Sequence, residues 1–127
     1  MQTQAVEDYL KAIYKLAERE SKVTTTQLAE SLGITPASTT GMLKKLKEMN
    51  LAVYAPYKGV SLTTSGEKVA LEIIRHHRLI ELYLAEALDV PWDRVHDEAE
   101  KWEHVLSEDI EERIDVQLGH PKADPHG

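Results

Sequence analysis

The apolar positions of the chain fall into runs at helical spacing, interrupted by one short stretch with the alternation of a strand. The first run covers residues 3–19, where one helix face carries Val6, Leu10, Ile13, Tyr14, Leu16 and Ala17. The inward positions of the next two runs are Leu28, Ala29 and Leu32, then Met42, Leu43, Leu46 and Met49. Apolar side chains that recur every three or four residues line one face of a helix. Three successive helices are therefore predicted.

Residues at the ends of the second and third runs have the chemistry that starts and stops helices. Thr24 and Gln27 have the spacing of a capping box, in which each side chain bonds the backbone N–H of the other residue. Gly33 suits the left-handed position that ends a helix. Thr35 and Pro36 supply a capping hydroxyl and a proline at the first helical position. A tight turn between the two helices is therefore predicted.

The stretch LAVYAPYKGVSLT, residues 51–63, changes to strand-like alternation. Its apolar positions flank the sequence PYKG at residues 56–59, which is typical of a turn, so a small hairpin is predicted. A second capping box at Thr64 and Glu67 predicts the start of a long helix that reaches about Leu88.

Two further helices are predicted in the last third of the chain. Pro91 separates the long helix from the first of them. Ser107 is placed to cap the second, which runs from Glu108 to about Leu118 with acids in its first turn, as the helix dipole favours. The last residues, 119–127, are expected to form a loop.

The order of helix, short helix, turn, helix and hairpin is that of a winged helix-turn-helix. The fold is therefore predicted to be mainly α, with this domain at residues 1–68 and a helical domain at residues 69–127.

The net charge of −7 argues against a nucleic-acid binder when it is taken alone. However, residues 1–68 hold 9 basic and 7 acidic residues, whereas residues 69–127 hold 6 and 15 together with all six histidines. This asymmetry suggests that the two domains have different tasks.

The third helix, Pro36 to Asn50, is the expected recognition helix. Its early side chains are small and hydroxyl-bearing, lysines follow, and the hairpin tip adds an aromatic and a basic residue. Hydroxyls and lysines suit phosphates and base edges, so DNA contacts are predicted for Thr35, Ala37, Ser38, Thr39, Thr40, Lys44, Lys45, Tyr57 and Lys58. The alternative is ordinary helix-start chemistry beside a solvated lysine face, since no early Arg, Gln or Asn offers bidentate base reading.

The stretch HDEAEKWEH, residues 96–104, divides into two faces when it is projected as a helix. An inward stripe is predicted for Val95, Ala99, Trp102 and Leu106, and the adjoining side carries His96, Glu100, Glu103 and His104. The last three of these lie within one turn, close enough to bind a single cation. His96 lies about 12 Å along the axis from His104, so it is assigned to a different site.

The preceding long helix offers partners for His96. His77 and Glu81 are four residues apart and therefore share a face, so a second metal site is predicted at His77, Glu81 and His96. His76 is expected to point elsewhere. On composition alone, a solvated acidic surface with incidental histidines explains the same residues.

Four segments closely resemble the diphtheria-toxin-repressor family of metal-activated transcriptional repressors, and the match runs essentially from end to end. They are VEDYLKAIYKL (6–16), LAVYAPYKGVSLTTSG (51–66), RHHRLIELYL (75–84) and VHDEAEKWEHVLSEDIEERI (95–114). The resemblance implies a winged helix-turn-helix, a helical dimerisation domain, two metal sites near their junction, and a homodimer on a palindromic operator. It also implies that longer relatives continue into an SH3-like domain, which this chain lacks either naturally or by truncation.

The resemblance also implies specific ligands. The primary metal site would be Asp8, Glu100, Glu103 and His104, and the ancillary site would be His77, Glu81 and His96. In the manganese branch, residues of the last loop complete the second site, which makes Asp124 and His126 weaker candidates. The iron branch has Met and Cys where this chain has Asp8 and Glu100. Carboxylates suit Mn²⁺ better than sulfur ligands do, so Mn²⁺ is the predicted metal, with Fe²⁺ and other divalent ions as alternatives.

One position departs from the manganese branch. Short members of that branch, which bind a closely spaced pair of metal ions, carry a Glu one turn after the Asp of the first helix. This chain has Lys11 at that position. The sequence therefore favours two separated metal sites over a closely spaced pair.

Absent motifs exclude several other classes. The chain has no cysteine, which excludes a disulfide and a thiolate metal site. It has no secretory signal and no membrane-spanning apolar run, so a cytoplasmic protein is expected. It has no HExxH and no nucleophile–base constellation, so it is expected not to be an enzyme. An iron-responsive member of the same family and a metal-independent winged-helix repressor remain as alternatives.

Overall fold

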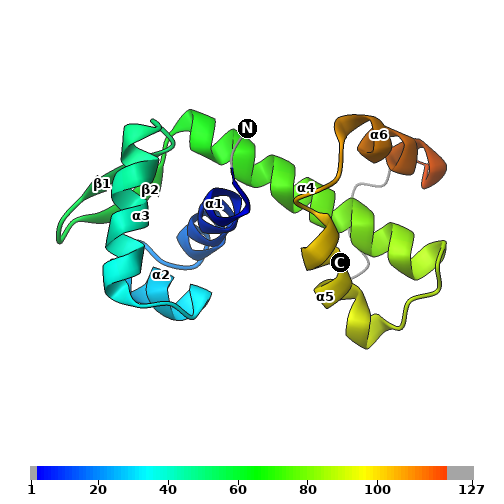
Figure 1. Ribbon diagram of the computed structural model, residues 1–127, viewed down its shortest axis with the longest axis horizontal. Coiled ribbons are helices and arrows are strands. Elements are labelled where there is room, and N and C mark those ends of the chain that lie inside the picture. Colours follow the sequence, from blue (N-terminus) through cyan, green and yellow to red (C-terminus); the bar gives the residue numbers. More distant parts are fainter. Residues whose placement is uncertain (1–2, 120–127) are drawn as a thin grey trace. The chain divides into compact units, whose positions relative to one another are not determined.

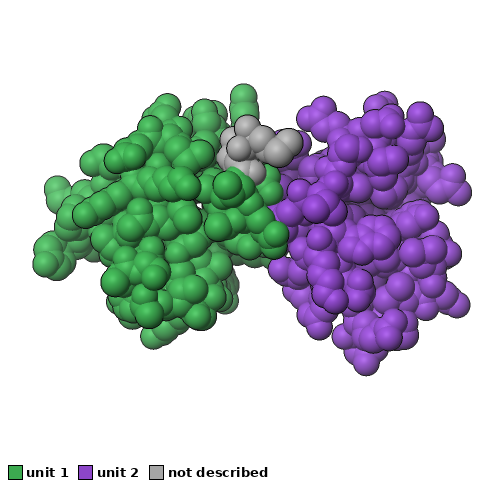
Figure 2. Space-filling model, viewed as in Figure 1, with its two compact units in different colours: residues 1–71 green, residues 72–127 purple. Residues whose placement is uncertain are grey.

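The computed structural model describes residues 3–119 as six helices and one two-stranded sheet, in the order α1, α2, α3, β1, β2, α4, α5, α6 (Figure 1). These residues belong to two compact units, residues 1–71 and 72–127 (Figure 2). The boundary between the units and the predicted domain boundary at residues 68–69 both lie within α4 (Thr64–Glu86). No helix in this part of the chain is both long enough and apolar enough to cross a bilayer.

Unit 1 begins with the three predicted helices, α1 (Gln4–Ala17), α2 (Thr25–Leu32) and α3 (Pro36–Glu48). The capping box of α2 is present in both directions, since the Gln27 amide N–H donates to Thr24 Oγ1 (3.1 Å) and the Thr24 N–H donates to Gln27 Oε1 (2.9 Å). Gly33 ends α2 with φ +68. Thr35 caps α3 by accepting from the Ser38 N–H at 3.2 Å. These local predictions are confirmed.

The hairpin consists of β1 (Ala52–Ala55) and β2 (Gly59–Leu62), which pair antiparallel with Ala52 opposite Leu62. A single bridge to the loop before α2 extends this sheet, because the Val60 N–H donates to the Val23 carbonyl at 3.0 Å. The hairpin is therefore the wing of a winged helix-turn-helix, and it is attached to the helices by its second strand.

The cap of the long helix α4 lies one residue earlier than predicted, and the helix begins at Thr64. The Gly66 N–H donates to Thr63 Oγ1 at 3.1 Å, and the Thr63 hydroxyl donates to the Asn50 carbonyl at 2.8 Å. Thr63, not Thr64, therefore caps α4. The prediction was wrong because the cap is selected by its tertiary bond to the loop before β1 as well as by its spacing.

The core of unit 1 follows the predicted stripes with three exceptions. Its buried members include Val6, Leu10, Ile13, Leu28, Leu43 and Leu46. Ala17 and Met49, which were expected to face inward, are exposed. They occupy the ends of α1 and α3, where a helix passes the edge of the core and the period no longer decides burial. Thr39, which was expected at the DNA surface, is completely buried.

Unit 2 contains the rest of α4 together with α5 (Trp92–Trp102) and α6 (Glu108–Gln117). Its small core joins α4 to α5 through Ile80, Leu84, Val95 and Ala99. Ser107 caps α6 as predicted, accepting from the Ile110 N–H at 3.2 Å. However, α5 ends at Trp102, so Glu103 is its C-cap and His104 lies in the turn that follows. Trp102 is also partly exposed, in contrast to the inward position predicted for it.

Candidate metal centre

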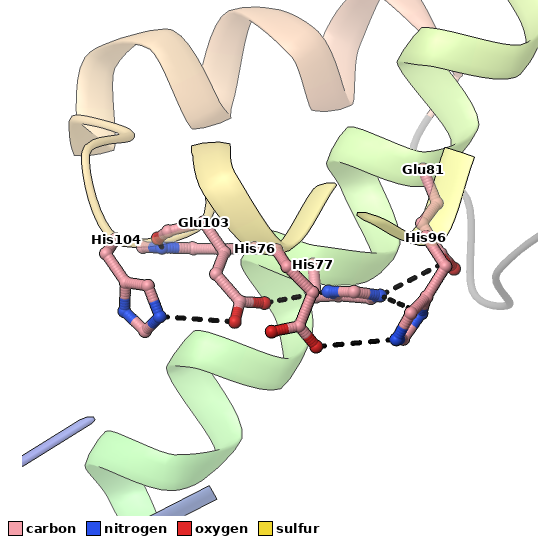
Figure 3. A network of polar contacts seen from close by, with 7 residues as sticks. His76, His77, Glu81, His96, Glu103 and His104 are labelled. Carbon is pink, nitrogen blue, oxygen red and sulfur yellow. Dashed lines mark hydrogen bonds and ion pairs between the residues drawn. The ribbon is translucent and has the colours of Figure 1, made fainter. Parts of the chain in front are cut away.

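Histidine and carboxylate side chains from α4 and from α5 with its C-terminal turn gather in unit 2 (Figure 3). The α4 helix supplies His77 and Glu81, one turn apart on the same face. The α5 helix supplies His96 from its middle and Glu103 from its C-cap. Glu81 is 1% exposed and Glu103 is fully buried. Carboxylates are seldom buried this completely unless they are paired or bind a cation.

One cluster of ligand atoms consists of His77, Glu81 and His96. His77 Nε2 lies 3.0 Å from Glu81 Oε2 and 3.1 Å from His96 Nδ1, and His96 Nδ1 lies 3.3 Å from the same Glu81 oxygen. The two imidazole rings meet edge to face, with centroids 4.7 Å apart. All three residues thus present one ligand atom to a common point. Two imidazoles and a carboxylate form a donor set that suits Mn²⁺, Fe²⁺ and Zn²⁺.

A second cluster forms around the buried carboxylate of Glu103. His77 Nδ1 lies 2.8 Å from Glu103 Oε2, and His104 Nε2 lies 3.3 Å from Glu103 Oε1. Glu100 lies at the border of both clusters, with Oε1 3.4 Å from His96 Nε2, and it forms a ligand group with His77 and Glu103. The predicted primary-site residues of α5 and its C-terminal turn therefore lie beside the predicted ancillary site, and not in an isolated position.

The His77 ring connects the two clusters. Its Nδ1 faces Glu103, while its Nε2 faces Glu81 and His96 (Figure 3). The sequence assigned His77 to one site only, because a helical projection gives the face of a ring and not the direction of its two nitrogens.

Three predicted ligands do not belong to the described part of unit 2. Asp8 lies half-buried on α1 in unit 1, and its role as a ligand stays a prediction. Asp124 and His126 lie outside the described residues, so their roles also stay predictions.

The predicted DNA-contacting residues occupy one compact unit, unit 1. Ala37, Ser38, Lys44 and Lys45 are exposed on α3, and Thr40 is half-buried. Thr35 is exposed and its hydroxyl also donates to Ser38 Oγ at 3.0 Å. Thr39 is different because its buried hydroxyl donates to the Thr35 carbonyl at 3.0 Å. Its position supports packing of α3, and it does not support a DNA contact.

At the tip of the wing, Lys58 is exposed and Tyr57 has an exposed fraction of 99%. Tyr57 also has a left-handed backbone with φ +66. The ammonium of Lys22 donates to the Tyr57 carbonyl at 2.7 Å. Lys22, Thr25, Lys44 and Tyr57 line a shallow groove between the wing and the starts of α2 and α3. Lys22 and Thr25 were not predicted, because the groove depends on how the wing folds back.

Two family models cover the chain almost completely. Residues 1–60 match the iron dependent repressor N-terminal DNA binding domain, and residues 63–127 match the iron dependent repressor metal binding and dimerisation domain. The chain belongs to the iron-dependent repressor family. The winged helix-turn-helix and the His–carboxylate clusters thus lie in the segments that this family uses for DNA and for metal, respectively.

Relatives of this chain differ in the metal that their names carry. The chain is 38% identical to an uncharacterised helix-turn-helix regulator of Methanocaldococcus jannaschii, covering 90% of this chain and 92% of the relative. It is 33% identical to the regulator MntR of Bacillus pumilus (90% and 78% covered) and 35% identical to the iron-dependent repressor IdeR of Mycobacterium leprae (95% and 53% covered). A manganese-dependent transcriptional repressor in complex with manganese matches with a TM-score of 0.87 and 42% identity, over 95% of this chain and 56% of that one. The chain therefore spans only about half the length of some relatives.

Proposed function

We propose that this protein is a metal-activated transcriptional repressor that binds a palindromic operator as a homodimer and responds to Mn²⁺. The observation that carries the proposal is the pair of His–carboxylate clusters joined at His77, within the segment that matches a metal-binding and dimerisation domain. Its relatives are transcriptional regulators, so we propose binding and not catalysis as its activity.

The residues of the two clusters fit a divalent cation by charge and by donor type. Without a cation, the buried carboxylates of Glu81 and Glu103 are close to the same imidazole. A bound divalent ion supplies positive charge to these oxygens and links α4 to the end of α5. We propose that Glu103, His104 and Glu100, together with Asp8 from α1, hold the regulatory ion, and that His77, Glu81 and His96 hold the second.

Metal binding changes DNA affinity in this proposal because its ligands come from both units. An ion bound by Asp8 and by the α5 residues favours one arrangement of the two units over others, and differential affinity of this kind shifts a population. If the favoured arrangement sets two recognition helices one DNA turn apart in the dimer, metal and operator affinity rise together.

The choice of Mn²⁺ rests on oxygen ligands. Asp8 and Glu100 offer carboxylates at the positions where the iron branch is expected to have sulfur, and hard oxygen donors suit Mn²⁺. The resemblance to a manganese-dependent repressor is consistent with this choice. Fe²⁺ is the alternative, because the iron-dependent repressor IdeR is similar at a comparable identity.

The surface available for a homodimer is an apolar groove of unit 2. It is lined by residues from the end of α4, the turn after α5, and α6, including Leu88, Trp102, Val105, Ile110 and Ile114. In the sequence, the apolar stripe of the long and last helices suggests an isologous interface through Ile73, Ile74, Leu82, Leu84, Leu88, Ile110 and Ile114. The first four of these side chains are buried within the described chain. The exposed members of the groove, Leu88, Trp102, Val105 and Ile110, are therefore the proposed contacts in an isologous interface.

A titration of DNA binding tests the proposal. A fluorescent palindromic duplex is titrated with metal-free protein at fixed salt, with and without Mn²⁺, Fe²⁺ under anaerobic conditions, or Zn²⁺. We expect Mn²⁺ to raise DNA affinity by about 5–150-fold, the usual size of an allosteric coupling. An affinity that no divalent ion changes would contradict metal activation and would favour a metal-independent winged-helix repressor. A response to Fe²⁺ alone would favour the iron alternative.

The assignment of the regulatory site is tested by Glu103→Ala. We expect this variant to lose metal-dependent DNA binding while it keeps the weaker binding of the metal-free protein. Retained activation by Mn²⁺ would remove Glu103 from the proposed site.

A further inference from the structure

His76 lies next to His77 on α4 and is 5% exposed, but it is not a member of either ligand cluster. Its Nδ1 donates to the main-chain carbonyl of Glu103 at 3.3 Å. His77 contacts the side-chain carboxylate of the same residue at 2.8 Å. Two successive histidines of α4 thus hold the backbone and the side chain of one candidate ligand.

The other ring nitrogen of His76 reaches a different helix. His76 Nε2 contacts the carboxylate of Glu111 on α6. Arg75 reinforces this connection, because its Nε lies 3.1 Å from Glu111 Oε1 and its terminal nitrogen lies 3.3 Å from Asp115. One buried ring therefore connects the end of α5, where Glu103 lies, to the first turn of α6.

The α6 helix also lines the apolar groove that is proposed as the dimer surface. Ile110 precedes Glu111 in the sequence and lies in this groove with Ile114 and with Trp102 at the end of α5. Because His76 contacts both residues, we expect a displacement of Glu103 to reach Glu111 through the His76 ring, and through Glu111 the apolar side chains of the groove.

We propose that His76 is a positioning residue that couples metal binding at Glu103 to dimer formation through Glu111. This inference rests on the proposed function, because it assigns a regulatory link to the same metal site and dimer surface. The link is reciprocal: metal strengthens the dimer by the same factor by which dimer formation strengthens metal binding.

Two substitutions separate the two contacts of the ring. His76→Asn keeps a donor near the position of Nδ1 but does not reach Glu111. His76→Gln places an amide near the position of Nε2 and loses the donor to the Glu103 carbonyl. Glu111→Gln breaks the link from the other side. The matched control is Glu98→Gln, which removes the same charge from an exposed ion pair with Lys101 on α5 and touches neither His76 nor Glu111.

The measurement is the dimer dissociation constant by sedimentation equilibrium, with EDTA and with saturating Mn²⁺, on the full chain. The ratio of the two constants is the coupling factor, which a purely structural role of His76 would leave unchanged. We expect a wild-type factor of about tenfold, a factor near one for His76→Asn, His76→Gln and Glu111→Gln, and the wild-type factor for Glu98→Gln. Melting of each metal-free variant shows that it is folded.

Three outcomes would overturn this inference. Variants with the wild-type factor would show that His76 carries no coupling. A wild-type dimer that Mn²⁺ does not strengthen, in a protein whose DNA affinity still responds to Mn²⁺, would remove the link and leave the proposed function intact. A wild-type protein that binds no Mn²⁺ would overturn the link and the metal-activated function together.

Discussion

His77 Nδ1 and Glu103 Oε2 lie 2.8 Å apart in the interior of unit 2, and this contact joins the two candidate metal clusters. The opposite nitrogen of the same ring lies 3.0 Å from Glu81 Oε2. When Nε2 binds a metal ion, a neutral ring carries its proton on Nδ1 and donates it to Glu103. A hydrogen bond from such a donor orients the Glu103 carboxylate toward the metal ion that it would bind. Occupation of one cluster is therefore expected to prepare the other.

His77→Ala is expected to weaken Mn²⁺ binding at both clusters, whereas His96→Ala weakens it at one. Loss of an outer-shell partner typically lowers metal affinity about 10–100-fold, and loss of a direct ligand lowers it further. Counting free Mn²⁺ by electron paramagnetic resonance during a titration gives both stoichiometry and affinity. Equal behaviour of the two variants would contradict the shared role of His77.

Metal binding is expected to stabilise the folded protein through Glu103. A ligand that binds only the folded state at 100 times its dissociation constant adds about 2.7 kcal/mol to the free energy of unfolding. We expect wild-type protein to show an increase of this size with Mn²⁺, lost on addition of EDTA. Glu103→Gln preserves the shape of the buried side chain and should remove most of the increase. Chemical denaturation with and without Mn²⁺ measures it.

The control for this prediction is Glu100→Gln, because the Glu100 side chain is 43% exposed whereas Glu103 is fully buried. Glu100 is expected to contribute less, since solvent screens an exposed carboxylate. If Glu100→Gln removed more of the Mn²⁺-dependent increase in the free energy of unfolding than Glu103→Gln does, Glu100 and not Glu103 would be the stronger ligand.

Features that depend on neighbours in sequence were predictable. The capping box of Thr24 and the C-cap at Gly33 each involve residues within one or two turns, so spacing alone predicts them. The cap of α4 was misplaced because Thr63 is also held by the Asn50 carbonyl, which lies in another part of the chain. Similarly, the burial of Thr39 depends on how α3 packs against other parts of the chain. Its position in the sequence, among exposed residues at the start of α3, does not predict that burial.

In the candidate site, too, features set by nearby residues were predictable and features set by tertiary contacts were not. The i, i+4 spacing of His77 and Glu81 predicts their shared face, and the structure places them 3.0 Å apart. The role of His76 could not be predicted, since it depends on Glu111, which approaches only when α6 folds back on α4. Spacing predicts which residues share a helix face, but it does not predict which residues of other helices they meet.

Tyr57 at the tip of the wing is expected to contribute to DNA binding in a way that salt does not change. It is 99% exposed, and its left-handed backbone costs roughly 1–2 kcal/mol for a residue with a side chain. Tyr57→Gly should relieve that cost, but the greater freedom of glycine in the unfolded chain offsets the gain, so stability stays nearly unchanged. DNA affinity is expected to fall with an unaltered salt slope. Lys58→Ala should reduce the slope of log affinity against log salt by about one. Fluorescence anisotropy at several salt concentrations separates the two effects, and equal slope changes would show that Tyr57 has no separate role.

The two helical glycines of unit 1 should respond in opposite directions to substitution by alanine. A Cβ at Gly66 would lie 2.0 Å from the Leu51 carbonyl oxygen, a backbone atom, whereas a Cβ at Gly41 meets nothing within 4 Å. Gly66→Ala must therefore separate the start of α4 from the strand that follows Leu51, and we expect a loss of roughly 1–3 kcal/mol or more. Gly41→Ala should add about 0.5–1 kcal/mol, because alanine restricts the unfolded chain and favours the helix. Urea denaturation midpoints measure both changes. A Gly66→Ala variant as stable as the wild type would show that α4 does not need this close approach to Leu51.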